Sequence, residues 1–216
     1  MLQWVLDALV PIHCVGCGCY NSWLCPDCLA AQWHPGCAHL PADIAPTIGQ
    51  LLFLGEYHAP LLQRAITTMK YQSISQLATI FGLALRRWFD LESYDYIVPV
   101  PLHRRRLRER GFNQSAVMAA ACNRPIIPAL QRTYYTKPQA SLRRHERLTN
   151  VQTAFTQTLT MSRSLAGATI LLVDDVCTTG STLQQCAAVL QNNQPKRIDA
   201  AVIAIDLLQP NNYRIE

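Results

Sequence analysis

The chain alternates between short apolar runs and longer segments in which apolar residues recur every three or four positions. The runs predict strands and the periodic segments predict helices, because side chains repeat their direction every two residues in a strand and about every 3.6 in a helix. In the segment 181–193, for example, Leu183, Cys186, Ala187 and Leu190 share one helix face. We expect strands at 51–57, 94–100, 168–173 and 198–205, and helices at 59–70, 77–90, 111–123 and 181–193. The β-α-β-α-β order and the apolar strands predict an α/β protein, with a parallel sheet covered by helices on both faces.

Two segments break this alternation and suggest how the chain is divided. Residues 35–46 contain several prolines and alanines, which predicts a linker. We therefore expect an N-terminal module with its linker at 1–46 and an α/β domain at 47–216. From 132 to 150 periodicity disappears and polar and basic residues dominate, which is typical of a long functional or mobile loop.

Composition excludes several classes of protein. Half of the 216 residues are hydrophobic and 15% are charged, which excludes an intrinsically disordered chain. No apolar run reaches the roughly eighteen residues that a transmembrane helix needs. Residues 1–11 contain Asp7 and no basic residue, unlike a secretory signal peptide. We therefore expect a folded, cytoplasmic protein with no transmembrane segment.

Basic charge is concentrated in one part of the chain. The net charge is +5, but residues 103–147 hold eleven Lys and Arg against two acids. This concentration indicates a surface for phosphate or nucleic acid, and taken alone it fits a solvated basic face equally well. The candidate nucleic-acid-binding residues are Arg104, Arg105, Arg106, Arg108, Arg110, Arg143, Arg144 and Arg147.

Six of the nine cysteines lie in the first 37 residues. Two Cys-x-x-Cys pairs, Cys14 with Cys17 and Cys25 with Cys28, can together supply four thiolates to one tetrahedral Zn²⁺. Four cysteines leave no open coordination position, so we expect a structural zinc that stabilises a segment too small to fold on its own core. The alternatives are unmetallated thiols or a disulfide. The spacing between the pairs is short, and possible substitute ligands are Cys19, Cys37 and His39.

The most informative segment runs from 170 to 182, with the sequence ILLVDDVCTTGST. Its apolar strand delivers Asp174 and Asp175 to a carboxyl end, where open α/β sheets bind ligands. A loop of small residues then opens directly into a helix, so backbone N–H groups and hydroxyls can surround a phosphate. The loop residues are Thr178, Thr179, Gly180, Ser181 and Thr182. Because carboxylates also accept hydrogen bonds from a vicinal diol, the segment predicts a ribose 5-phosphate site.

Two other proteins with acids at a strand end are excluded. The chain contains no G-x-x-x-x-G-K-[ST] motif, which a P-loop nucleotide triphosphatase requires. Only about forty residues follow the acid pair, too few for the remainder of a phosphoacceptor receiver domain.

Residues 170–182 resemble the 5-phosphoribosyl 1-pyrophosphate (PRPP) signature of type I phosphoribosyltransferases. Further motifs narrow this resemblance to the ComF/GntX family of phosphoribosyltransferase-like proteins, over nearly the whole chain. They are the two cysteine pairs, VPVPLH at 98–103, RGFNQ at 110–114, and Arg147-x-x-Asn150 followed by Ala154-Phe155. The resemblance implies a type I phosphoribosyltransferase-like sheet flanked by helices, a small zinc-binding module, and PRPP bound with Mg²⁺.

The same resemblance implies roles for individual residues. Asp174 and Asp175 match the acids that bind the ribose hydroxyls and act in catalysis, and the loop after them matches the 5′-phosphate site. The pyrophosphate loop corresponds to Pro101, Leu102, His103 and Arg104. For His103, binding pyrophosphate and capping a loop are equally good interpretations. Lys70 matches a family lysine, although a surface lysine is the simpler interpretation. Segment 132–150 matches the loop that closes over substrates, and the N-terminal module takes the place of the hood.

For function, the resemblance implies a competence protein that acts in the cytoplasm on incoming single-stranded DNA during natural transformation. Its expected partners are PRPP, single-stranded DNA and the DNA-uptake machinery at the inner membrane. Two alternatives remain because no residue set identifies an acceptor: a phosphoribosyltransferase acting on a small molecule, and a PRPP-sensing regulator. The sequence leaves open whether turnover occurs.

Overall fold

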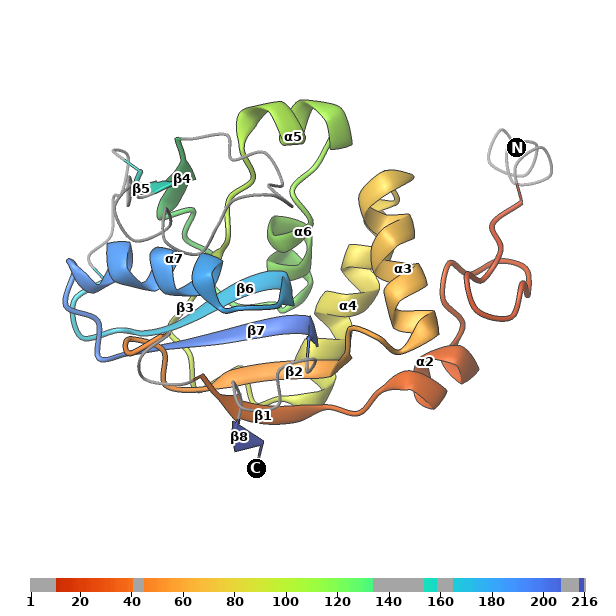
Figure 1. The fold of residues 1–216 in the computed structure, drawn as a ribbon, viewed down its shortest axis with the longest axis horizontal. Helices are drawn as coiled ribbons and strands as arrows, with labels where there is room; N and C mark the ends of the chain where they lie inside the picture. Colours follow the sequence, from red (N-terminus) through yellow and green to blue (C-terminus); the bar gives the residue numbers. More distant parts are fainter. Residues whose placement is uncertain (1–10, 41–44, 134–153, 159–164, 207–213, 216) are drawn as a thin grey trace, which may run out of the picture.

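A six-stranded sheet forms the centre of the computed structural model (Figure 1). The structure describes residues 11–40, 45–133, 154–158, 165–206 and 214–215. Its strands are β1 (Gly36–His39), β2 (Leu51–Glu56), β3 (Tyr96–Pro99), β6 (Thr169–Cys177), β7 (Arg197–Ile205) and β8 (Arg214–Ile215). The strand order is β3-β6-β7-β2-β1-β8. The four strands from β3 to β2 are parallel, whereas β1 is antiparallel to both β2 and β8. The structure confirms the expected α/β class.

Helices cover both faces of this sheet. The helices are α2 (Pro26–Gln32), α3 (Pro60–Tyr71), α4 (Ser75–Trp88), α5 (Arg104–Arg110), α6 (Gln114–Ala121) and α7 (Ser181–Gln191), of which α3, α4 and α6 pack on one face of the sheet and α7 on the other. Along β6, Leu171 and Val173 pack in the core formed with α3, α4 and α6, while Ile170 and Leu172 pack in the core formed with α7. This alternation explains the uninterrupted apolar run, because each face of the strand needs its own buried residues. A separate two-stranded ribbon consists of β4 (Leu130–Arg132) and β5 (Phe155–Gln157).

The four predicted strands and four predicted helices are confirmed apart from their ends, whereas α2, α5, β1, β4, β5 and β8 were not predicted. The linker prediction is wrong for Gly36–His39, which form β1, because Ala38 is fully buried and pairs with Leu51. The short helix α5 was not predicted, because none of its residues is buried and it therefore carries no apolar period. The boundary at residue 46 stays a prediction. Most of the expected loop, 134–150, lies outside the described residues.

Close packing of α4 on α6 sets the position of α6 against the sheet. A Cβ atom on Gly82 of α4 would collide with the carbonyl oxygen of Met118 and lie 2.7 Å from the Cβ of Ala121. The glycine therefore lets the two helix backbones approach closely. The first turn of α6 consequently faces the carboxyl end of β6, where the acid pair lies. Among the described residues, no helix is long and apolar enough to cross a bilayer.

Candidate functional site

A cavity of about 600 Å³ lies at the carboxyl ends of β3 and β6. The acid pair and Thr182 line it from β6 and α7, Pro101 and Leu102 line it from the segment after β3, and Lys70 lines it from the end of α3. Parallel strands bring their carboxyl ends to one edge of the sheet, so these segments meet despite their separation in sequence. The predicted acid pair, part of the phosphate loop and part of the pyrophosphate loop therefore share one cavity.

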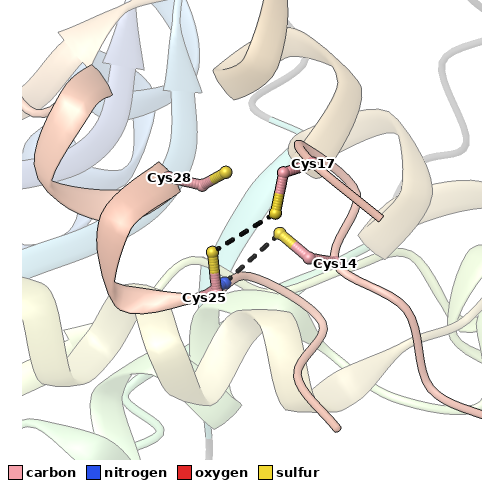
Figure 2. A group of neighbouring side chains, drawn as sticks. All are labelled: Cys14, Cys17, Cys25 and Cys28. Carbon is pink, nitrogen blue, oxygen red and sulfur yellow. Dashed lines mark hydrogen bonds between the residues drawn. The ribbon is translucent and has the colours of Figure 1, made fainter. Parts of the chain in front are cut away.

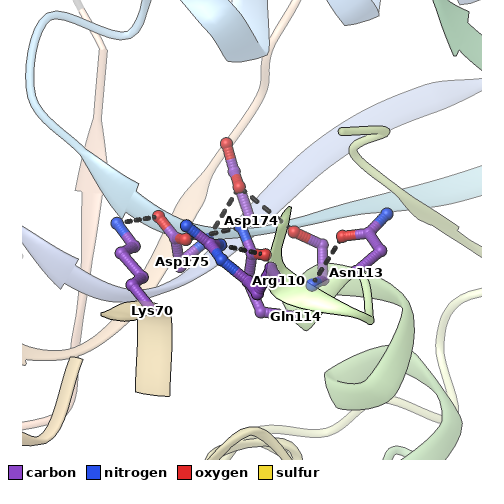
Figure 3. Close-up of polar contacts among 7 residues, drawn as sticks. Lys70, Arg110, Asn113, Gln114, Asp174 and Asp175 are labelled. Carbon is purple, nitrogen blue, oxygen red and sulfur yellow. Dashed lines mark hydrogen bonds and ion pairs between the residues drawn. The ribbon is translucent and has the colours of Figure 1, made fainter. Parts of the chain in front are cut away.

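Both aspartates are buried and held by neighbouring side chains (Figure 3). Lys70 Nζ lies 2.8 Å from Asp175 Oδ1, and Gln114 Nε2 donates to Asp175 Oδ2 at 2.7 Å. Ser115 Oγ and the Asp175 N–H both donate to Asp174 Oδ1, at 3.2 and 2.8 Å. The carboxylates are therefore held in a fixed orientation at the cavity wall, with Asp175 ion-paired inside the protein.

Burial also changes the protonation of this pair. Desolvation raises the pKa of Asp174 to about 7, and the negative charge of Asp175 acts in the same direction. The Asp175 N–H, Lys70 and Ser115 oppose this rise but do not cancel it. Burial therefore favours the protonated form of the Asp174 carboxyl, which can donate as well as accept a hydrogen bond.

Lys70 is not a surface lysine, so the simpler sequence interpretation is wrong. Its side chain is only 22% exposed and pairs with Asp175. It stands in the last turn of α3, which runs from the carboxyl end of β2 toward the cavity. Amphipathic periodicity alone does not distinguish this position from an exposed one, whereas the match to a family lysine did point to it.

The contributions of Gln114 and Ser115 were not predicted. Asn113 caps α6 by accepting from the Ser115 N–H at 3.1 Å, and its Nδ2 donates to the carbonyl of Val100 at 3.0 Å. This double contact ties the start of α6 to the segment after β3 and directs Gln114 and Ser115 at the acids. The only sequence signal was the RGFNQ motif, which ends at Gln114, the residue before Ser115.

The predicted phosphate loop leads directly into α7. Gly180 is the buried N-cap of this helix with φ of 74°, a left-handed conformation that favours glycine. The residues Thr178, Thr179 and Ser181 are exposed, while Thr182 lines the cavity. An anion can approach the first turn of a helix in this arrangement. The ligand contacts assigned to the loop stay predictions.

The basic segment divides into two groups on α5. The side chains of Arg106 and Arg110, one helical turn apart, line the cavity, and Arg132 from β4 joins them. Burial lowers the pKa of both Arg110 and Arg132, and Arg110 Nη1 donates to Gln114 Oε1 at 2.5 Å. The exposed group comprises Arg104, Arg105 and Arg108, of which Arg105 pairs with Glu109 at 2.8 Å.

Among the remaining predicted residues, His103 lies in the described part of the chain and Arg143, Arg144 and Arg147 do not. The Nδ1 atom of His103 accepts from the Arg105 N–H at 3.2 Å, which shows the capping role; pyrophosphate binding by His103 stays a prediction. The candidate residues Arg143, Arg144 and Arg147 lie outside the described residues.

The four predicted zinc ligands come together near α2 (Figure 2). The sulfur atoms of Cys14, Cys17, Cys25 and Cys28 all lie within 4.8 Å of one another. A tetrahedron of thiolates at the usual Zn–S distance has sulfur atoms about 3.8 Å apart, and the Cys17 and Cys25 sulfurs are 3.6 Å apart. The described residues Cys19, Cys37 and His39 are not members of this group. The donor set therefore fits a closed, structural zinc site.

The backbone around Cys14 favours the thiolate form of that residue. Burial raises the pKa of Cys14, but N–H groups of Cys25, Cys17 and Gly16 outweigh it and lower the value to about 6. The hydrogen bonds from Gly16 and Cys25 to the Cys14 sulfur measure 3.4 and 3.3 Å. Residue 16 must be small, because a Cβ there would lie 2.6 Å from the Cys28 sulfur.

Comparison with known proteins identifies the family of the chain. Residues 121–212 match the family model described as "Phosphoribosyl transferase domain". The DNA utilization protein YhgH of Escherichia coli K12 is 33% identical over 189 residues, which is 80% of both chains. Competence protein F of Haemophilus influenzae is 28% identical over 206 residues, covering 83% of this chain and 90% of that protein.

More distant matches add little. Competence protein ComFC of Bacillus subtilis is 29% identical over 60% of this chain and 53% of its own length. A solved structure of an allosteric regulatory enzyme of purine biosynthesis covers 63% of this chain and 30% of its own, with a TM-score of 0.43 and 14% identity, which is too distant to support a functional argument. The Escherichia coli relative alone is sufficient: with 33% identity over 80% of its length, it shows that the chain belongs to the ComF/GntX family of phosphoribosyltransferase-like proteins.

Proposed function

We propose that this protein binds PRPP together with Mg²⁺ in the cavity at the ends of β3 and β6. The observation that carries the proposal is the meeting of three features around one cavity of about 600 Å³. These features are a buried acid pair, the loop that opens α7, and a group of cations from α3, α5 and β4. PRPP carries a group for each feature: a diol for the acid pair, a phosphomonoester for the loop and a pyrophosphate for the cations.

Each part of PRPP has a place in this proposal. The 5′-phosphate binds at the loop from Thr178 to Thr182, where N–H groups of the first turn of α7 and the hydroxyls can donate. The ribose hydroxyls face Asp174 and Asp175. The pyrophosphate lies near the cations Lys70, Arg106 and Arg110, which line the cavity.

The acid pair also fits the expected Mg²⁺ ion. Carboxylate oxygens are preferred Mg²⁺ ligands, and this ion usually retains waters and binds substrate phosphates as well as one or two carboxylates. Asp174 and Asp175 both line the cavity, although Asp175 is already paired with Lys70. When bound, Mg²⁺ would neutralise negative charge on the pyrophosphate.

The same geometry suits transfer of the phosphoribosyl group. As the bond from ribose C1 to pyrophosphate breaks, positive charge develops on the ribose and negative charge on the leaving group. The acid pair lies on the proposed ribose side, and the arginines of α5 lie on the proposed pyrophosphate side. Their positions can therefore stabilise both charges as they form.

We further propose that the protein acts on single-stranded DNA in the cytoplasm during natural transformation, with the DNA-uptake machinery as a partner. The relatives named for competence and DNA utilization support this role. The outer face of α5 supports it independently, because Arg104, Arg105 and Arg108 are exposed on the helix whose inner face lines the cavity. Lys and Arg that follow a DNA backbone bind it by releasing counterions.

Salt dependence tests the DNA interface. Replacing Arg104, Arg105 and Arg108 with Ala should weaken binding of a poly-dT oligonucleotide and reduce the slope of log K against log salt by about 2. The matched control replaces the exposed Arg86, Arg87 and Lys196 with Ala, which removes the same charge from elsewhere. Equal effects of the two triple variants would show that net charge alone, and not α5, attracts DNA.

Calorimetry of PRPP with Mg²⁺, followed by an assay of pyrophosphate release with and without the oligonucleotide, separates the candidate activities. Binding without release indicates a binding role, including that of a PRPP sensor. Pyrophosphate release that is stimulated by the oligonucleotide would link PRPP turnover to the action on single-stranded DNA. Release that requires a small-molecule acceptor supports the alternative phosphoribosyltransferase, and absence of PRPP binding contradicts the proposal as a whole.

A further inference from the structure

A second hollow of about 540 Å³ lies between α2 and α4 and shares no lining residue with the proposed PRPP cavity. The cysteine-rich segment contributes Leu29 and Trp33 to it, and α4 contributes Ile80, Leu83 and Trp88. The segment that holds the four-cysteine cluster and a helix of the α/β domain thus form the two walls of one groove.

The groove exists because α4 has two apolar stripes. One stripe includes Leu77, Phe81 and Leu85, which are fully buried in the core. The other stripe follows the helical spacing i, i+3, i+4, i+7 and i+8; its apolar members are Ile80, Leu83, Ala84 and Trp88, and the cation Arg87 lies at i+7. A helix that packs against one core needs only the first stripe.

Parts of the second stripe are left in water. Leu83 is 51% exposed and Trp88 is 48% exposed, and both line the groove. Trp33 on the opposite wall is held in place by Phe81, with ring centroids 6.0 Å apart and an interplanar angle of 82°. Adjacent exposed apolar side chains around a hollow are typical of a protein interaction site.

We propose that this groove binds an acidic amphipathic helix of a partner protein. Among the described residues that line the groove, Arg87 is the only charged one, and the exposed Arg86 precedes it in the last turn of α4. An apolar stripe on the partner would fill the hollow, while a carboxylate beside that stripe would meet Arg87. This binding surface is separate from the proposed PRPP site and does not depend on that assignment.

Charge and shape make the other occupants less suitable. A symmetric dimer would use the same surface on both copies. The basic ends of the two α4 helices would then lie in one interface, where their like charges repel. Single-stranded DNA needs a row of cations along its backbone, whereas this lining is mainly aliphatic apart from its two tryptophans. Residues 1–10 of this chain are mainly apolar and carry one acid, Asp7, so deletion of these residues shows whether they occupy the groove.

The test uses two fluorescein-labelled synthetic peptides and the full chain. Both peptides carry Leu at helical spacing; the flanking positions are Glu in one and Lys in the other. We expect the Glu peptide to bind in fluorescence anisotropy, and the Lys peptide to bind at least about tenfold more weakly. Leu83→Glu and Trp88→Glu should each weaken binding of the Glu peptide more than about tenfold. The matched control Ile126→Glu alters an exposed apolar residue outside the groove and should leave binding unchanged.

Reversing the charge of Arg87 tests the electrostatic part of the proposal without removing an apolar side chain from the groove. Arg87→Glu should weaken the Glu peptide by about fivefold and strengthen the Lys peptide by a similar factor. The proposal is overturned if neither peptide binds, or if Arg87→Glu weakens both peptides equally. It is also overturned if the Glu peptide binds only after residues 1–10 are deleted, if Leu83→Glu dissociates a dimer of the full chain, or if the groove variants reduce binding of poly-dT instead.

Discussion

The ion pair between Lys70 and Asp175 gives the sharpest test of how the site is held together. Among the described residues, Lys70→Ala leaves the Asp175 carboxylate, which is only 6% exposed, with Gln114 as its hydrogen-bonding side-chain partner. Removing one partner of a fully buried pair typically costs about 3 to 5 kcal/mol. The Lys70 side chain is 22% exposed, so water can partly replace it. We therefore expect the free energy of unfolding to fall by about 2 kcal/mol.

A double-mutant cycle measures the pair directly. Urea unfolding of Lys70→Met, Asp175→Asn and the double variant should give a coupling energy of about 1 to 2 kcal/mol, because the second change costs little once the first is made. Arg105→Met and Glu109→Gln form a control cycle on an exposed pair, for which coupling of about 0.5 kcal/mol is expected. Additive effects of the two substitutions at 70 and 175 would refute the interpretation that this ion pair stabilises the site.

Three further predictions follow from the site, the cysteine cluster and the helix packing. The pKa of Asp174 is raised to about 7 in the folded chain. Between about pH 4 and about pH 7 the folded chain therefore keeps a proton at Asp174 that the unfolded chain has released. Because of this difference, the free energy of unfolding falls as pH rises through that window. Asp174→Asn should therefore reduce the loss of unfolding free energy between about pH 5 and about pH 7.5, and an unchanged pH profile would contradict the raised pKa. Elemental analysis of protein purified without added metal should find about one zinc per chain; Cys17→Ser should lose it and Cys19→Ser should keep it, whereas the opposite pattern would assign Cys19 as the ligand. Gly82→Ala should lower the free energy of unfolding by about 2 kcal/mol through its collision with α6, while the exposed neighbour Leu83→Ala should change it by under about 1 kcal/mol; equal effects would argue against the close contact.

Local sequence pattern predicted the parts of the fold that have a strong period. The strand containing Leu171 and the helix containing Leu183 were predicted because burial on one or two faces leaves a direct trace in the sequence. The acid pair and the cysteine tetrad were also predicted, since each depends on residue type at close spacing. Strand β1 was missed because its four residues lie among prolines and alanines, and its pairing with β2 is a tertiary effect.

The remaining features of the site depend on contacts between distant segments. Lys70 and Gln114 both contact Asp175, yet they lie on different helices, and no local pattern links them. The division of the α5 arginines into a cavity-facing and an exposed group likewise requires knowing that 104–110 form a helix. Residue type alone predicted a basic region, whereas the helix separates cations for the cavity from cations for the surface.

PRPP binding in the cavity is the property on which the proposed function of this protein depends most. Isothermal titration calorimetry with Mg²⁺ should show PRPP binding to the wild-type chain. The double variant Asp174→Asn, Asp175→Asn should lose at least about tenfold in affinity, because the proposed diol acceptors lose their charge. Glu92→Gln, an exposed carboxyl outside the cavity, is the matched control and should bind as the wild type does. Unchanged PRPP affinity in the folded double variant, or no binding to the wild type, would contradict the central claim.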